Sequence, residues 1–118
     1  MSFKFEDLLI WRKALELTEI VNTVSMKFPK DELYILSSQI KRASDSTALN
    51  IAEGSQGQSN PEFNRFLGMA LRSSIEVVAC IFIAKQRNII SEEDYLLIYS
   101  KEEELIKMIQ SLRNKLTA

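Results

Sequence analysis

Apolar residues recur at the three- and four-residue spacings of an α-helix in four segments of the chain. The stripe of the first segment consists of Ile10, Ala14, Leu17, Val21, Val24 and Phe28. Side chains at these spacings lie on one face of a helix, as they do in the cores of helical bundles. The four predicted helices cover about residues 6–26, 31–53, 59–88 and 91–116.

Residues that begin or end helices separate these segments. Gly54 is expected to end the second helix in the left-handed backbone conformation that glycine often adopts at this position. Ser59 is followed three residues later by Glu62, and Ser91 by Asp94, which is the spacing of an N-terminal capping box. The third and fourth helices are therefore expected to begin directly after these two serines.

Helices joined by such short loops predict an all-α fold, which we expect to be a left-handed, antiparallel up-down four-helix bundle. The length of 118 residues suits a single domain, 1–118, and the sequence contains no visible internal repeat. Only three Gly and two Pro are present, too few for the many turns of a β-sheet protein. The hydrophobic content of 46% is that of an ordinary globular chain.

The second half of the third helix, Val77 to Ala84, is apolar nearly all round. A helix in an isolated bundle normally has a polar outer face. We therefore expect a homo-oligomer in which another subunit covers this helix, with Trp11 and the second face of the first helix as candidate contributors.

The same apolar run is much shorter than the ~20 residues that span a bilayer. The N-terminal sequence MSFKFEDLLIW has acids where a signal peptide needs a basic start. We therefore expect a cytoplasmic protein with no membrane partner.

The sequence contains no His, and its single Cys80 lies inside the apolar run VVACIFIA. Without His, the commonest general base, metal ligand and activator of a nucleophile is missing. The loop EGSQGQS lacks the preceding strand and the Gly-Lys-Ser/Thr ending of a phosphate-binding loop. We therefore predict no catalytic residue, no metal, no cofactor and no small-molecule substrate, and we expect the protein not to be an enzyme. Cys80 is interpreted as a buried structural thiol.

Glu102 occupies a position where the apolar stripe of the fourth helix should continue. It belongs to the run KEEELIK, and consecutive acids point to different sides of a helix. We interpret Glu102, Glu103 and Glu104 as a solvated outer face with ion pairs.

A polar stripe lies beside the apolar face of the second helix and consists of Gln39, Arg42, Ser46, Asn50 and Glu53. Glu76 of the third helix has apolar neighbours and should need a partner, for which Arg42 or Arg72 is the candidate. The first interpretation is a buried polar network that fixes helix register and subunit arrangement. The alternative is a surface that contacts a ligand or nucleic acid.

Basic residues are scattered along the chain, and the net charge is −1. Lys41, Arg42, Arg65 and Arg72 can come together if the second and third helices are antiparallel neighbours, and they are candidate contacts for RNA or DNA. A second basic patch, Lys107, Arg113 and Lys115, lies near the C-terminus. The alternative is an ordinary solvated surface.

Three stretches of the sequence carry a family resemblance. FKFEDLLIWRKALEL, FPKDELYILSSQIKRASDSTALNIAEG and NPEFNRFLGMALRSSIEV resemble, in order and spacing, the "four helix bundle protein" family encoded by intervening sequences of large-subunit ribosomal RNA genes. The resemblance implies an up-down bundle that forms a ring-like homopentamer. A related group, the accessory variability determinant proteins of diversity-generating retroelements, shares the fold and binds nucleic acid, but is strongly basic. No catalytic residue is associated with the family.

These observations predict a non-enzymatic, oligomeric assembly or scaffold protein with a nucleic-acid-related partner of the ribosomal RNA type. The alternative hypothesis is a protein–protein adaptor that does not contact nucleic acid.

Overall fold

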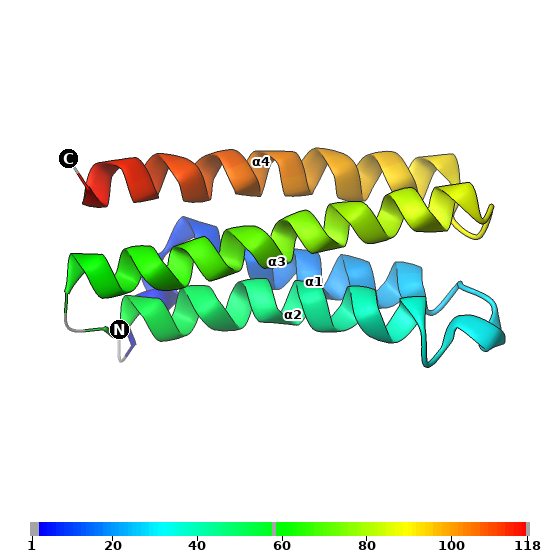
Figure 1. Cartoon of the computed structure of the whole chain (residues 1–118), viewed down its shortest axis with the longest axis horizontal. Coiled ribbons are helices and arrows are strands. Elements are labelled where there is room, and N and C mark those ends of the chain that lie inside the picture. Colours follow the sequence, from blue (N-terminus) through cyan, green and yellow to red (C-terminus); the bar gives the residue numbers. More distant parts are fainter. Residues whose placement is uncertain (1–2, 58, 118) are drawn as a thin grey trace.

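The computed structural model describes residues 3–57 and 59–117 and contains four long helices (Figure 1). The long helices are α1 (Leu9–Ser25), α2 (Leu36–Ser55), α3 (Asn60–Gln86) and α4 (Glu92–Leu116). Two short 3-10 helices, η1 (Lys4–Asp7) and η2 (Lys30–Glu32), precede α1 and α2. Within the described residues there is no β-strand. The all-α class predicted from the sequence is confirmed.

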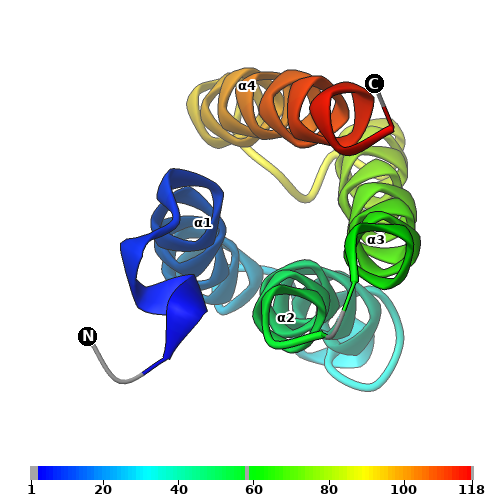
Figure 2. The same ribbon diagram turned by 90° about the vertical axis from the view of Figure 1, so that its left-hand side faces the viewer.

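Consecutive helices lie side by side and run in opposite directions, as in an up-down bundle. Figure 2 shows α1, α2, α3 and α4 in that order around the long axis. The α2–α3 contact is the most extensive, and the α1–α4 contact that closes the bundle is the smallest. The bundle measures 43 × 25 × 20 Å.

The starts of the last two helices were predicted correctly. The Ser59 side chain accepts a hydrogen bond from the backbone N–H of Glu62 at 3.3 Å. The Ser91 side chain accepts one from the backbone N–H of Asp94 at 3.0 Å. Both serines thereby satisfy amide groups that have no partner within the helix.

The prediction that Gly54 ends a helix in the left-handed conformation is wrong. No glycine in the described part of the chain has a positive φ, and α2 continues through Gly54 to Ser55. A Cβ atom at Gly54 would lie 2.5 Å from the Cβ of Phe66 on α3. Glycine is therefore needed at this position because α2 and α3 approach each other closely there.

The starts of the first two helices also differ from the predicted ones. The 3-10 helix η1 occupies the predicted first turn, and α1 begins only at Leu9. Likewise η2 and the following turn occupy the predicted beginning of the second helix, so that α2 begins at Leu36. Both segments make local turns instead of extending the long helices.

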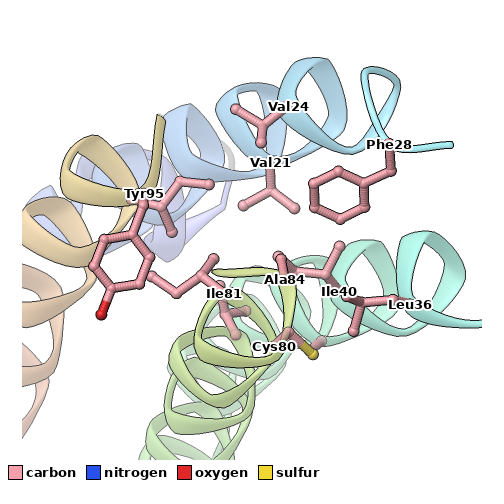
Figure 3. Packing of buried hydrophobic residues seen from close by; sticks show 12 residues of the cluster. Val21, Val24, Phe28, Leu36, Ile40, Cys80, Ile81, Ala84 and Tyr95 are labelled. Carbon is pink, nitrogen blue, oxygen red and sulfur yellow. The ribbon is translucent and has the colours of Figure 1, made fainter. Parts of the chain in front are cut away.

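The apolar core consists of two clusters, one at each end of the bundle. The cluster near the α1–α2 connection is drawn in Figure 3, in which Val21, Phe28, Ile40 and Ile81 converge from three helices and the connection. The second cluster contains Ile10, Ala14, Leu17, Ala48, Ile51, Leu67, Ala70, Leu105 and Ile109. Along α2, α3 and α4, a polar residue separates the members of one cluster from those of the other.

Candidate functional site

A buried polar layer crosses the middle of the bundle and consists of Thr47, Ser74 and Glu102. Each residue lies between the two clusters along its own helix, and their exposed fractions are 2%, 0% and 1%. The hydroxyl oxygens of Thr47 and Ser74 are 3.2 Å apart. The Thr47 hydroxyl also donates to the carbonyl oxygen of Ala43 at 3.3 Å. The layer therefore joins α2 and α3 by hydroxyl contacts and receives a carboxyl group from α4.

The sequence had indicated that Glu102 belongs to a solvated surface. This prediction is wrong, because the side chain is buried. Burial raises the pKa of its carboxyl to about 7, and a hydrogen bond with Ser74 opposes this rise. Its Oε1 atom has no hydrogen-bond partner among the described residues. An uncompensated charge in an apolar interior is costly, so the protonated carboxyl is favoured up to near neutral pH.

The other acidic residues of the run do lie at the surface. Glu104 pairs with Lys13 at 3.1 Å, and Lys101 pairs with Glu16 at 2.9 Å across the α1–α4 seam. A hydrogen bond from Lys101 lowers the pKa of Glu16. Within the described residues no group of acidic or Cys side chains has the arrangement of a metal site.

The polar stripe of α2 differs from the predicted buried network. Glu76 accepts a hydrogen bond from the side chain of Gln39, whereas Arg42 donates to the Ser38 hydroxyl at 3.0 Å. The proposed pairing of Arg42 with Glu76 is therefore wrong. Gln39, Arg42 and Glu53 are exposed in the single chain.

A second group of contacts lies farther along the same stripe. Asn50 donates to the carbonyl and hydroxyl oxygens of Ser46 at 2.9 and 3.1 Å, and the Ser73 hydroxyl of α3 donates to that of Ser46 at 2.9 Å. This group and the Gln39–Glu76 contact both link α2 to α3. The predicted role of the stripe in assembly stays a prediction.

Cys80 is buried, as predicted, with an exposed fraction of 3%. Burial, with a smaller contribution from Glu76, raises the pKa of its thiol to about 11. The nucleophilic thiolate is therefore strongly disfavoured near neutral pH.

The four predicted basic residues do not form one surface. Lys41 and Arg42 lie beside Tyr34 and Asp45 in a shallow depression near the start of α2. Arg65 and Arg72 lie on α3, in a different depression. Antiparallel packing places the start of α2 beside the second half of α3, whereas both arginines belong to its first half.

Arg65 and Arg72 line a groove of about 350 Å³ with Arg113 of α4, which the sequence had assigned to the C-terminal patch. We call it the arginine groove, and Gly68, Met69, Leu71 and Ile75 complete its lining. Arg113 donates from Nε to the side-chain oxygen of Asn64 at 2.9 Å and from Nη1 to that of Gln110 at 3.5 Å. The contact between Arg113 and α3 depends on the rotation of two helices, which a one-dimensional pattern does not give.

The outward face of α3 changes from basic to apolar along its length. Ile75, Phe82 and Ile83 have exposed fractions of 53%, 52% and 41%. By length and hydropathy α3 would suffice to cross a membrane, and 33% of its most apolar window is buried within the bundle. A core helix of a helical bundle can have the same length and hydropathy, so these two properties are weak support for a membrane span.

A second exposed apolar group lies at the corner between α1 and α2. Leu33, Tyr34 and Ile35 there have exposed fractions of 48%, 89% and 60%. By contrast, Trp11, a predicted interface residue, packs against the Phe5 ring of its own chain with centroids 4.6 Å apart.

Comparisons with known proteins agree with this fold. The family described as 23S rRNA-intervening sequence protein matches residues 6–111. A solved structure from Bacteroides thetaiotaomicron, described as a protein with unknown function from the S23 ribosomal protein family, superposes with a TM-score of 0.81. It is 27% identical and covers 89% of this chain and 98% of its own. The comparison with curated proteins gives no significant match.

Proposed function

Because the chain belongs to the 23S rRNA-intervening sequence protein family, we propose that it is a non-enzymatic, homo-oligomeric assembly protein with an RNA partner of the ribosomal type. The observation that carries the assembly is the outward apolar face in the second half of α3, formed by Phe82 and Ile83. Large contiguous apolar surfaces on water-soluble proteins usually mark sites of association.

A ring is favoured over a two-fold dimer because the chain exposes two different apolar groups. In a ring each subunit contacts its neighbour through unlike surfaces, whereas a two-fold interface uses the same surface twice. The α3 face and the corner group of Leu33, Tyr34 and Ile35 belong to different elements of the chain, α3 and the α1–α2 connection. We propose that they meet between neighbouring subunits of a homopentamer in the cytoplasm.

Light scattering at several protein concentrations tests the assembly. A pentamer has a mass of about 68 kDa, five times the chain mass of 13.6 kDa. Ile83→Asp should reduce the mass to that of one chain, because a charge cannot be buried unpaired in an apolar interface. The matched control is Leu96→Asp, which introduces the same charge at an exposed apolar residue of α4 and should leave the mass unchanged. A monomeric wild-type protein would refute the assembly.

The RNA partner is tested separately. Binding of a fluorescein-labelled RNA stem-loop, measured by polarisation, should weaken steeply from about 50 to 200 mM salt, since phosphate contacts release counterions. An intact assembly that does not bind the stem-loop even at low salt would instead support a protein–protein adaptor.

A further inference from the structure

We propose that the arginine groove binds the phosphodiester backbone of RNA. This inference rests on the RNA partner of the proposed function and assigns that partner a site on α3 and α4. The groove combines Arg65 and Arg72 of one helix with Arg113 of another.

The positive charge of the groove is not neutralised by the protein itself. The ion pairs of the described residues use Lys13, Lys27, Lys85, Arg87 and Lys101. None of them involves an arginine of the groove. The lining also contains no Asp or Glu. An anion in the groove would therefore meet guanidinium groups whose charge no carboxylate of the lining neutralises.

The two acidic residues of α3 are directed to α2 and the loop that follows it. Glu76 accepts a hydrogen bond from Gln39 of α2. The Glu62 carboxylate lies against Gly57 in the α2–α3 loop. Glu62 lies three residues before Arg65 and Glu76 four residues after Arg72, but none of the ion pairs given for the described residues joins either acid to its neighbouring arginine.

Arg113 is held in place by neutral groups. Asn64 and Gln110 accept from its Nε and Nη1 atoms, so they orient the guanidinium plane without cancelling its charge. Its Nη2 atom faces Gly68, where a Cβ atom would lie only 3.3 Å away. Glycine thus leaves room for the guanidinium beside α3. A guanidinium fixed in this way loses little conformational entropy when it binds a phosphate.

The arginines are spaced for an extended anion. Arg65 and Arg72 lie on the same outward face of α3, separated by two helical turns or about 10 Å along the axis. This separation allows each to contact a different phosphate. Because phosphate contacts carry no base information, the binding should be largely independent of RNA sequence.

The experiment measures binding of the labelled stem-loop, and of a second stem-loop of unrelated sequence, to the full-length protein over a salt series. Arg72→Gln and Arg65→Gln should each weaken binding to both RNAs. Each should also reduce the slope of log affinity against log salt by about one. The matched control is Lys30→Gln, which removes one positive charge from η2, at the opposite end of α2 from Arg65. It should leave the affinity and the slope close to wild type.

Three outcomes would overturn the inference. In the first, the wild type binds RNA, but Arg72→Gln and Arg65→Gln have the same affinity and salt slope as Lys30→Gln. The RNA partner would then be supported, and its contacts would lie outside the arginine groove. A polyglutamate competitor as effective as unlabelled stem-loop would show a site for acidic protein instead. If the wild-type protein does not bind the stem-loop, both the RNA partner and the proposed site are refuted. The homo-oligomer is tested independently by the mass from light scattering.

Discussion

The buried carboxyl of Glu102 should make the bundle more stable in mild acid than in mild alkali. Its pKa is 4.5 in a solvated chain and about 7 in the folded protein. Between these values the folded state binds more protons than the unfolded state, so the free energy of unfolding falls as the pH rises. Replacing Glu102 by Gln keeps the size of the side chain and removes the titration.

The magnitude follows from the difference between the two pKa values. A difference from 4.5 to about 7 corresponds to roughly 3 kcal/mol of stability, lost progressively as the pH rises from about 4.5 to 7. With a urea m-value of about 1–3 kcal/mol/M, the midpoint of unfolding should fall by roughly 1–3 M. The sequence contains no His, the side chain that ordinarily titrates in this interval, so few other groups contribute.

The assay is urea unfolding followed by circular dichroism at about pH 5 and pH 8, at one protein concentration because assembly also stabilises the fold. The free energy of unfolding of Glu102→Gln should be nearly the same at the two pH values. At the higher pH the variant should be more stable than wild type. Glu103→Gln removes a carboxyl from the neighbouring, exposed position and should retain the wild-type pH dependence. If wild type and Glu102→Gln lose stability in parallel, the interior carboxyl is not the cause.

Two further predictions concern the helix ends and contacts, and thermal unfolding measures both. Gly54→Ala should lower the free energy of unfolding by roughly 1–3 kcal/mol, and with it the melting temperature, because the new Cβ atom would overlap Phe66. Gly68→Ala is its control, since the nearest atom to its Cβ would be Nη2 of Arg113 at 3.3 Å, and a loss as large as that of Gly54→Ala would contradict the close-approach explanation. Ser91→Ala should cost about 1 kcal/mol through the lost helix cap, and no change would show that water replaces it.

The fold was predictable because helical periodicity depends only on the order of residues. Ile98, Leu105 and Ile109 recur at helical spacings in the fourth segment, and all three are buried in the structure. The same stripe included Glu102, so its burial was signalled by position. Its acidic neighbours suggested a solvated surface and led to the wrong interpretation.

The errors arose where a residue type has two physical uses. Glycine near the end of a helix suits either a left-handed turn or a close contact, and only the position of Phe66 distinguishes them for Gly54. The composition of the arginine groove was equally hidden. Arg113 is far from Arg72 in sequence, and their proximity depends on how α3 and α4 are rotated and aligned.

The polar layer also affects which compact packings the chain can adopt. If α4 slid along its neighbours by two turns, Glu102 would leave Ser74 and face the apolar side chains of one of the two clusters. Its carboxyl would then lose its hydrogen bond in an apolar environment, at a cost of roughly 1–3 kcal/mol. Apolar stripes alone fit several such displaced packings almost equally well. A single carboxyl group thus widens the energy gap between the native bundle and its displaced competitors.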